Sequence, residues 1–245
     1  MLSRRHLVLG LVGASACKRG EPEAAPAPAP PTSPRTRSHA GVEMIEVFQN
    51  GATETSPLIV AIHGRGDRPE NWVDDVRTFP GQAQIVIPRA FEAYGDGFTW
   101  FPLHGGMTDE TLGAAVGASE ARLWSGILDV AKGRKVIVTG FSQGGILSFA
   151  IASRHADVVT HAFPCAGGCP GPLLPKNKAK AAPVLAFHGT EDHVLEIQFA
   201  REAVHAFQEQ GNVAELKEYP GLGHGMNAAM HRDLWDALQK ALPKG

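Results

Sequence analysis

The fold is decided by residues 136–144, which read VIVTGFSQG. The first four residues are apolar or β-branched, as in a buried strand, and apolar residues resume at 146–151 as in a helix. Gly140 and Gly144 carry no Cβ that would collide where the helix folds back over the strand. This G-x-S-x-G spacing predicts a nucleophile elbow, a sharp strand-to-helix turn that exposes the hydroxyl of Ser142 at its tip.

A serine hydroxyl at such a turn needs a base and an orienting carboxylate before it becomes a nucleophile. The pattern alone also arises by chance in glycine-rich turns that carry no chemistry. In hydrolases with a nucleophile elbow, the three residues follow in the chain order serine, acid, histidine. The residues after Ser142 supply an acid and a histidine in that order, each in a loop that follows an apolar segment.

The acid is predicted to be Asp192. The apolar run VLAF reads as a buried strand, and the segment HGTEDHV follows it at 188–194. This segment reads as a loop at the carboxyl end of the strand, where a side chain can reach a site. Glu191, directly before Asp192, is the competing candidate.

The histidine is predicted to be His224. Residues 216–219 read as the last strand and lead into PGLGHGM at 220–226. The chain has 11 histidines, so a histidine alone means little. His193 directly follows the predicted acid and His231 falls in the final helix, so only His224 combines the chain order with a glycine-rich loop after a strand.

An earlier strand-to-helix loop completes the predicted site. The apolar run LIVAI is followed by HGRGD at 63–67. In hydrolases with a nucleophile elbow, a His- and Gly-rich loop donates one backbone N–H to the oxyanion hole, and the residue after the nucleophile donates another. The predicted donors are therefore Arg65 and Gln143. His63 and Asp67 are expected to brace this loop by hydrogen bonds.

Four segments carry a family resemblance: HGRGD (63–67), GFSQGG (140–145), HGTEDHV (188–194) and GLGHG (221–225). With them, the chain resembles the α/β-hydrolases of the phospholipase/carboxylesterase family, which includes acyl-protein thioesterases and small bacterial carboxylesterases. The resemblance covers residues 42–242. It implies a catalytic triad, an oxyanion hole of two backbone N–H groups, and no metal or organic cofactor. The triad would be Ser142, Asp192 and His224, and the oxyanion hole Arg65 and Gln143.

The loop at 89–108 is the expected substrate-binding segment. It is rich in aromatic residues and too long for a simple connection. In the family that the chain resembles, the matching region ends in a Trp-Phe pair and lines the substrate cleft. This implies that Trp100 or Phe101 contacts the acyl or alcohol group. The alternative is an aromatic cluster that only covers the core.

Strand-like and helix-like segments alternate along the chain. The predicted strands are 42–48, 58–62, 84–88, 135–139, 158–163, 183–187 and 214–219, and the predicted helices are 69–78, 109–132, 143–154, 196–210 and 227–241. Such alternation predicts an α/β fold with a mostly parallel sheet and helices on both faces, as in an α/β-hydrolase. All parts of the predicted site follow strands, which is where open α/β sheets place their sites.

Composition and charge argue against several classes of function. The chain has 245 residues, of which 43% are hydrophobic, and a net charge of −2. Six of the 23 Lys and Arg residues and two of the 25 Asp and Glu residues lie in residues 1–40, so the remainder has a net charge of −6. An acidic domain lacks the electrostatic footprint of a nucleic-acid-binding protein. The sequence contains no run of about 20 apolar residues, so no membrane-spanning helix is predicted.

The N-terminal residues predict export. A charged start and a short apolar stretch end in Ala-Ser-Ala, and Cys17 follows immediately. This resembles a bacterial lipoprotein signal, in which residues 1–16 are removed and Cys17 is lipidated. We expect an enzyme tethered to a membrane on its periplasmic or cell-surface face. Plain cleavage after Ala16, which yields a soluble periplasmic or secreted protein, is the alternative. The arginine pair leaves the general secretory and twin-Arg routes open.

The segment after Cys17 is predicted to be a linker. Residues 21–40 hold six prolines and five alanines, a composition typical of extended chain without a core. The expected organisation is therefore a signal at 1–16, a lipid-attachment cysteine and linker at 17–40, and a catalytic domain at 41–245.

Two further cysteines, Cys165 and Cys169, could form a disulfide in an oxidising compartment. The alternative is a pair of small unpaired hydrophobic residues. Two thiols without clustered partners fall short of the four ligands of a structural metal site.

Together these patterns predict a serine carboxylic-ester hydrolase that acts on a small-molecule ester through an acyl-enzyme. Within the same chemistry, a thioesterase, a lysophospholipase or a peptidase is the alternative. From another class, the alternative is a catalytically silent hydrolase fold that serves as a binding protein. The intact serine, acid and histidine favour an enzyme, and the patterns leave the oligomeric state open.

Overall fold

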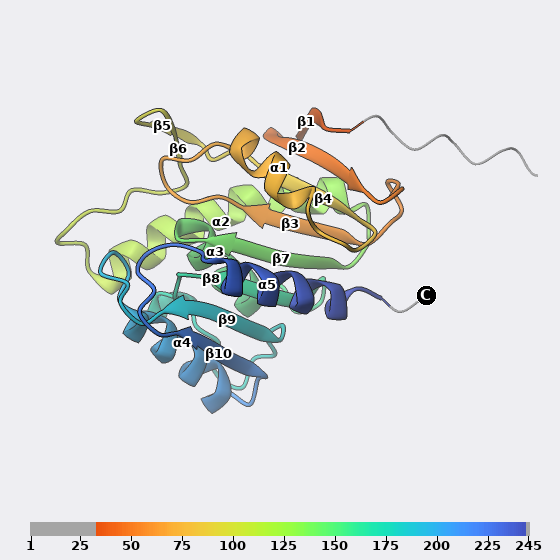
Figure 1. Cartoon of the computed structure of the whole chain (residues 1–245). Coiled ribbons are helices and arrows are strands. Elements are labelled where there is room, and N and C mark those ends of the chain that lie inside the picture. Colours follow the sequence, from red (N-terminus) through yellow and green to blue (C-terminus); the bar gives the residue numbers. More distant parts are fainter. Residues whose placement is uncertain (1–32, 244–245) are drawn as a thin grey trace, which may run out of the picture.

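The computed structural model describes residues 33–243 (Figure 1). The predicted signal, Cys17 and most of the predicted linker lie outside the described residues, as do residues 244 and 245.

The core of the molecule is an eight-stranded sheet with the order β1-β2-β4-β3-β7-β8-β9-β10. The first two pairs, β1 with β2 and β2 with β4, are antiparallel, and all other neighbours run parallel. The strands are β1 (Arg35–His39), β2 (Val42–Gln49), β3 (Leu58–Ile62), β4 (Ala83–Pro88), β7 (Val136–Phe141), β8 (Val159–Cys165), β9 (Val184–Gly189) and β10 (Ala214–Tyr219). The predicted α/β fold with a mostly parallel sheet is confirmed.

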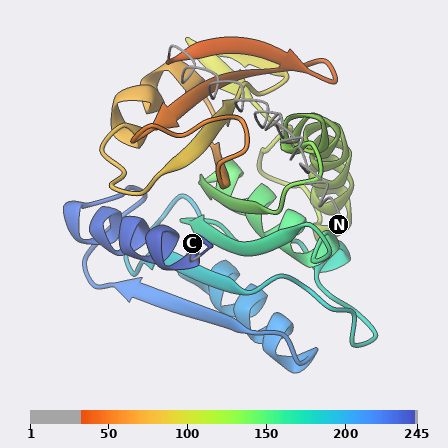
Figure 2. The same ribbon diagram turned by 90° about the vertical axis from the view of Figure 1, so that its right-hand side faces the viewer.

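Helices cover both faces of this sheet (Figures 1 and 2). On one face, α2 (Asp109–Ala131), α3 (Gln143–Arg154) and α4 (Ile197–Glu209) bury apolar side chains in one core cluster. On the other, η1 (Pro69–Trp72), α1 (Val73–Val76) and α5 (Ala228–Ala241) pack in a second cluster. The remaining elements are the hairpin β5 (Glu92–Tyr94) with β6 (Gly97–Thr99), and the short helix η2 (Gly171–Leu173).

Most predicted elements lie within two residues of their observed ends, because buried parallel strands read as continuous apolar runs. The hairpin β5–β6 was not predicted. Its strands are three residues long and lie inside the aromatic loop, too short for an alternating pattern to stand out. The helix expected at 69–78 is divided into a 3-10 turn and one turn of α-helix.

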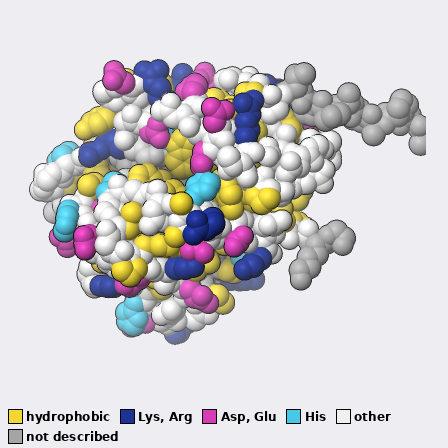
Figure 3. Space-filling view, viewed as in Figure 1, with side chains coloured by type: hydrophobic (Ala, Val, Ile, Leu, Met, Phe, Trp, Pro, Cys, Tyr) yellow, Lys and Arg dark blue, Asp and Glu magenta, His cyan; other side chains and the backbone are white. Residues whose placement is uncertain are grey.

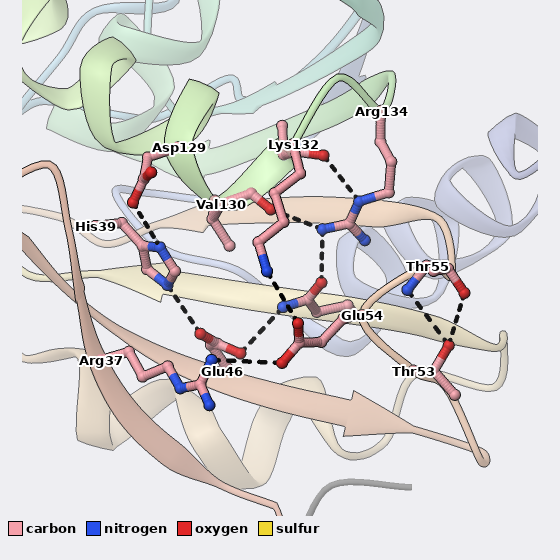
Figure 4. A network of polar contacts seen from close by, with 12 residues as sticks. Arg37, His39, Glu46, Thr53, Glu54, Thr55, Asp129, Val130, Lys132 and Arg134 are labelled. Carbon is pink, nitrogen blue, oxygen red and sulfur yellow. Dashed lines mark hydrogen bonds and ion pairs between the residues drawn. The ribbon is translucent and has the colours of Figure 1, made fainter. Parts of the chain in front are cut away.

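Strand β1 corrects the predicted linker boundary. The linker was expected to run through residue 40, but Arg35–His39 pairs antiparallel with β2, with Arg35 opposite Glu46 and His39 opposite Val42. The sequence RTRSH has no apolar residue and follows a proline-rich stretch, so composition alone favours a linker. The strand is stabilised instead by the polar network shown in Figure 4.

Glu46 lies at the centre of this network. Its side chain is 1% exposed and accepts hydrogen bonds from Arg35 at 2.8 Å and from Gln84 at 3.1 Å. The ring of His39 lies 2.8 Å from the other carboxylate oxygen. Arg35 also bonds to Glu54 at 2.6 Å and, as the main cause, lowers the pKa of Glu54 to about 2. A buried carboxylate is stable only with such partners, so Arg35 fastens the edge strand to the sheet.

The structure contains Cys165 and Cys169 as buried free thiols, so the predicted disulfide is not formed. The physical reason is that the two side chains pack in different core clusters. Cys165 ends β8 and packs in the cluster beside α5, whereas Cys169 packs in the cluster of α2, α3 and α4 on the opposite face. Burial raises the pKa of the Cys165 thiol to about 12, and burial likewise raises the pKa of Cys169. Both therefore behave as small hydrophobic residues, which is the alternative given above.

The visible surface mixes charges of both signs with apolar side chains (Figure 3). Of the helices in residues 33–243, none combines the length and apolarity needed to cross a bilayer.

The network at Glu46 predicts that two arginines of β1, Arg35 and Arg37, contribute differently to the free energy of unfolding. Arg35→Met removes the cation that contacts the buried carboxylate, and we expect the free energy of unfolding to fall by about 1–3 kcal/mol. Arg37→Met is the matched control, because Arg37 is 47% exposed and, within residues 33–243, its guanidinium pairs only with Glu54, at 3.4 Å. Urea denaturation of the two variants measures the difference. Equal stabilities would contradict the assigned role of Arg35.

Candidate active site

The loops after β7, β9 and β10 bring together the three side chains expected from the sequence. His224 Nε2 lies 3.0 Å from Ser142 Oγ, and His224 Nδ1 lies 2.7 Å from Asp192 Oδ2. With its proton on Nδ1, the imidazole donates to the carboxylate and accepts from the serine hydroxyl. The three residues therefore form one continuous hydrogen-bonded chain, although 82 residues separate the serine from the histidine.

Ser142 occupies the tip of the turn between β7 and α3. Its φ of 57° and ψ of −116° place a non-glycine residue in a rarely populated region. Gly140 and Gly144 permit the turn, because a Cβ on Gly144 would collide with the carbonyl oxygen of Ile62. The Ser142 N–H donates to the Cys165 carbonyl at 3.0 Å, which ties the turn to the neighbouring strand.

Asp192 is buried, at 3% exposure, and both of its carboxylate oxygens have hydrogen-bond partners. One oxygen accepts from the backbone N–H groups of Val194 and Leu195, both at 2.9 Å, and the other faces His224. Burial disfavours the charged form, but the hydrogen bonds from His224 and from the two amides outweigh it and hold the pKa of Asp192 below its usual value. The competing candidate Glu191 is exposed and contributes only its backbone N–H, to the Leu222 carbonyl.

His188, for which no role was expected from the sequence, also touches this carboxylate. Its Nε2 lies 3.2 Å from Asp192 Oδ2 and 2.8 Å from the Leu195 carbonyl oxygen. The side chain is 1% exposed. It thereby links the end of β9 to the loop that carries the acid. Its place at the end of the VLAF strand was the only signal in the sequence.

The segment HGRGD packs directly against the turn at Ser142. A Cβ on Gly64 would lie 3.4 Å from the Cβ of Ser142, so the backbone directly before Arg65 packs against the serine. Within residues 33–243, the N–H groups of Arg65 and Gln143 have no protein acceptor. Backbone N–H groups without a protein acceptor, one on the residue after the candidate nucleophile and one on the residue after Gly64, are the kind of donors that an oxyanion requires.

The residues expected to brace this loop do so. His63 is fully buried, with Nδ1 2.7 Å from the Gly64 oxygen, and its Nε2 accepts from the Ala90 N–H at 3.2 Å. Burial lowers the pKa of His63, which favours the neutral ring that this pattern requires. Asp67 accepts from the side chains of Asn71 and Trp72, both at 2.7 Å.

Trp100 and Phe101 are not the cleft surface expected from the sequence. Each is 2% exposed and packs in the core cluster of α2, α3 and α4. The Trp100 indole N–H donates to the His63 carbonyl at 2.8 Å. The alternative, an aromatic cluster that covers the core, describes both residues, because their large apolar surface is sequestered when the loop folds over the sheet. Tyr94, at 48% exposure, is an aromatic residue that this loop does expose.

Comparison with known proteins shows which family this arrangement belongs to. The family model described as Phospholipase/Carboxylesterase matches residues 43–242. The chain belongs to this family. Acyl-protein thioesterase 1 of Kluyveromyces lactis is 23% identical over 209 residues, which cover 76% of this chain and 92% of the relative. Esterase YpfH of Escherichia coli is 26% identical over 212 residues, which cover 81% and 88%.

Solved structures agree with the phospholipase/carboxylesterase assignment at the level of the fold. Esterase PE8 superposes with a TM-score of 0.68 at 21% identity and covers 86% of this chain and 99% of its own. The Bacillus cereus carboxylesterase superposes with a TM-score of 0.66 at 17% identity, covering 81% and 95%. The fold is thus that of the esterase α/β-hydrolases, and the chain is a hydrolase of the carboxylesterase and thioesterase type.

Replacing each of the two neighbouring acids, Asp192 and Glu191, by its amide should affect the rate of ester hydrolysis differently. Asp192→Asn leaves an amide against His224 and favours the wrong imidazole tautomer, so the ester hydrolysis rate should fall by about 10³–10⁴. Glu191→Gln is the matched control and should stay near the wild-type rate, because its exposed side chain carries none of the hydrogen bonds to the imidazole. Steady-state assays with p-nitrophenyl acetate compare them. A larger loss in Glu191→Gln would reverse the assignment.

Proposed function

We propose that this protein is a serine carboxylic-ester hydrolase that works through an acyl-enzyme on Ser142. The observation that carries the proposal is the hydrogen-bonded chain from Ser142 to His224 to Asp192, at 3.0 and 2.7 Å, at the tip of a strand-to-helix turn. The family, whose relatives are named as carboxylesterases and thioesterases, supports the same chemistry.

In the first half of the reaction, Ser142 Oγ attacks the ester carbonyl while His224 Nε2 takes its proton. The carbonyl oxygen becomes an oxyanion, which the N–H groups of Arg65 and Gln143 stabilise. Asp192 holds the imidazole with Nδ1 protonated and stabilises its charged form. His224 then gives its proton to the leaving alcohol, and the acyl group remains on Ser142.

In the second half, water attacks the acyl-enzyme and His224 takes the proton from that water. The oxyanion forms again at the same two donors. Collapse of this intermediate returns the proton to Ser142 Oγ and releases the acid. The reaction needs no group beyond the side chains and amides already described.

Thioesters are the second candidate substrate class, because the acyl-transfer steps are the same and one relative is named as an acyl-protein thioesterase. A lysophospholipase, a peptidase and a silent binding protein are further alternatives. Oxygen esters and thioesters of the same acyl chain, assayed side by side over increasing chain length, separate the classes of substrate. A silent protein would hydrolyse none of them.

If Ser142 is the nucleophile, its replacement should abolish both fluorophosphonate labelling and ester turnover. A fluorophosphonate should label the wild-type protein, and Ser142→Ala should lose both labelling and ester turnover while its thermal unfolding stays cooperative. Ser125→Ala is the control, because Ser125 is exposed on α2 and its hydroxyl, among the described residues, bonds only to the Ala121 carbonyl. Near-wild-type turnover by Ser142→Ala would exclude the proposed mechanism.

We also propose, from the sequence of the N-terminal residues, that the enzyme is exported and tethered by a lipid on Cys17. More than one acyl chain on the cysteine would give stable membrane attachment, whereas one chain binds only marginally. Cys17→Ser should move active enzyme out of the membrane fraction or block processing, with the turnover of the catalytic domain unchanged. Mass spectrometry of the native protein tests this. A mature chain that begins at Cys17 without lipid supports simple secretion, and an intact Met1 in the cytoplasm contradicts export.

A further inference from the structure

The side chain of Gln143 has no part in the mechanism above, which uses only its backbone N–H. It is nevertheless fully buried, at the first position of α3. Its amide oxygen accepts from the Trp100 N–H at 3.0 Å, and its amide nitrogen donates to the Phe101 carbonyl at 2.8 Å. The Thr99 hydroxyl lies 3.0 Å from the same amide oxygen. Both ends of the side chain therefore hold one segment, residues 99–101.

This segment in turn holds the loop that carries the other predicted oxyanion donor. The Trp100 indole N–H donates to the His63 carbonyl at 2.8 Å. His63 is joined to the next residue by the contact of its Nδ1 with the Gly64 oxygen, and Arg65 follows. A continuous path of hydrogen bonds thus runs from the side chain of Gln143 through Trp100 to the backbone that precedes Arg65.

Burying an amide side chain in the core is unfavourable unless its donor and its acceptor are both hydrogen-bonded. An unpaired buried donor or acceptor costs about 1–3 kcal/mol, and an apolar residue of the same length would avoid that risk. Here the amide oxygen and nitrogen are both used, with distances of 2.8–3.0 Å. The two ends of a planar amide also fix the orientation of what they bind, which a hydrophobic contact does not.

We propose that Gln143 is a positioning residue that sets the distance between the two oxyanion donors. Its backbone supplies one N–H, and its side chain, through Trp100 and His63, holds the loop that supplies the second. This inference rests on the proposed ester hydrolysis and adds to it the group that aligns its oxyanion hole. Because the donors matter most when the oxyanion forms, misalignment should slow the chemical step more than it weakens substrate binding.

The test compares Gln143→Met and Gln143→Glu with the wild type on p-nitrophenyl butyrate. Met keeps the length and the backbone N–H but loses every side-chain hydrogen bond. We expect kcat to fall by about 10–10²-fold with little change in KM, less than the loss for a missing donor. Glu in its protonated form can donate to the Phe101 carbonyl and accept from Trp100, so at acid pH Gln143→Glu should retain more of the wild-type kcat than Gln143→Met.

Two further variants separate positioning from general destabilisation. Ser148→Ala removes another fully buried hydrogen bond of α3, to the Gly144 carbonyl at 2.8 Å, and should lower the unfolding temperature with little effect on kcat. Trp100→Phe removes the indole N–H that reaches His63, together with part of a buried ring, so it should lower the unfolding temperature and also lower kcat in the same sense as Gln143→Met, with little change in KM. If Gln143→Met does not fold, Trp100→Phe decides the question.

The outcomes are distinct. A folded Gln143→Met with reduced kcat and near-normal KM supports the inference. A wild-type kcat in that variant, or a rise in KM alone, overturns it while leaving the proposed function in place. A wild-type protein that neither hydrolyses the ester nor reacts with a fluorophosphonate contradicts the proposed function and, with it, this inference.

Discussion

The backbone at Ser142 is the constraint on which the rest of the site depends. A positive φ on a residue with a side chain is unfavourable, and it persists only where the surroundings over-determine it. Here a strand ends and a helix begins within one residue, and Gly140 and Gly144 remove the atoms that would block the turn. This backbone conformation determines where the Ser142 side chain lies. It holds the hydroxyl above the edge of the sheet, where the loops after other strands can reach it.

The acid side of the site illustrates how burial and hydrogen bonding compete. Burial alone would raise the pKa of Asp192, yet two backbone amides and His224 keep it ionised. His188, at the end of β9, approaches the same carboxylate oxygen as His224. A carboxylate held from several directions cannot rotate freely, so the direction in which it presents its charge to the imidazole is set before substrate arrives.

The aromatic loop illustrates how a segment can be fixed in place by the core while its backbone binds a residue of the site. Trp100 and Phe101 bury their rings in the core, while their backbone groups bind the side chain of Gln143. Burial of the rings gives the segment a rigid base, since a close-packed core tolerates little displacement. The hydrogen bonds of Gln143 and His63 are therefore made to a segment that is itself fixed.

The sequence by itself determined seven strands of the main sheet and their order along the chain, the turn at Ser142 and the candidates Asp192 and His224. These are local features, written in apolar runs and in glycines whose missing Cβ a sharp turn requires. Only the tertiary structure decided that RTRSH is a strand, because its stability comes from a buried carboxylate on β2. The same holds for Cys165 and Cys169, which face opposite sides of the sheet, and for His188 and the side chain of Gln143, which gain their partners from distant segments. Contacts between residues far apart in the chain depend on which faces the packed sheet and helices present to each other, and no local pattern records them.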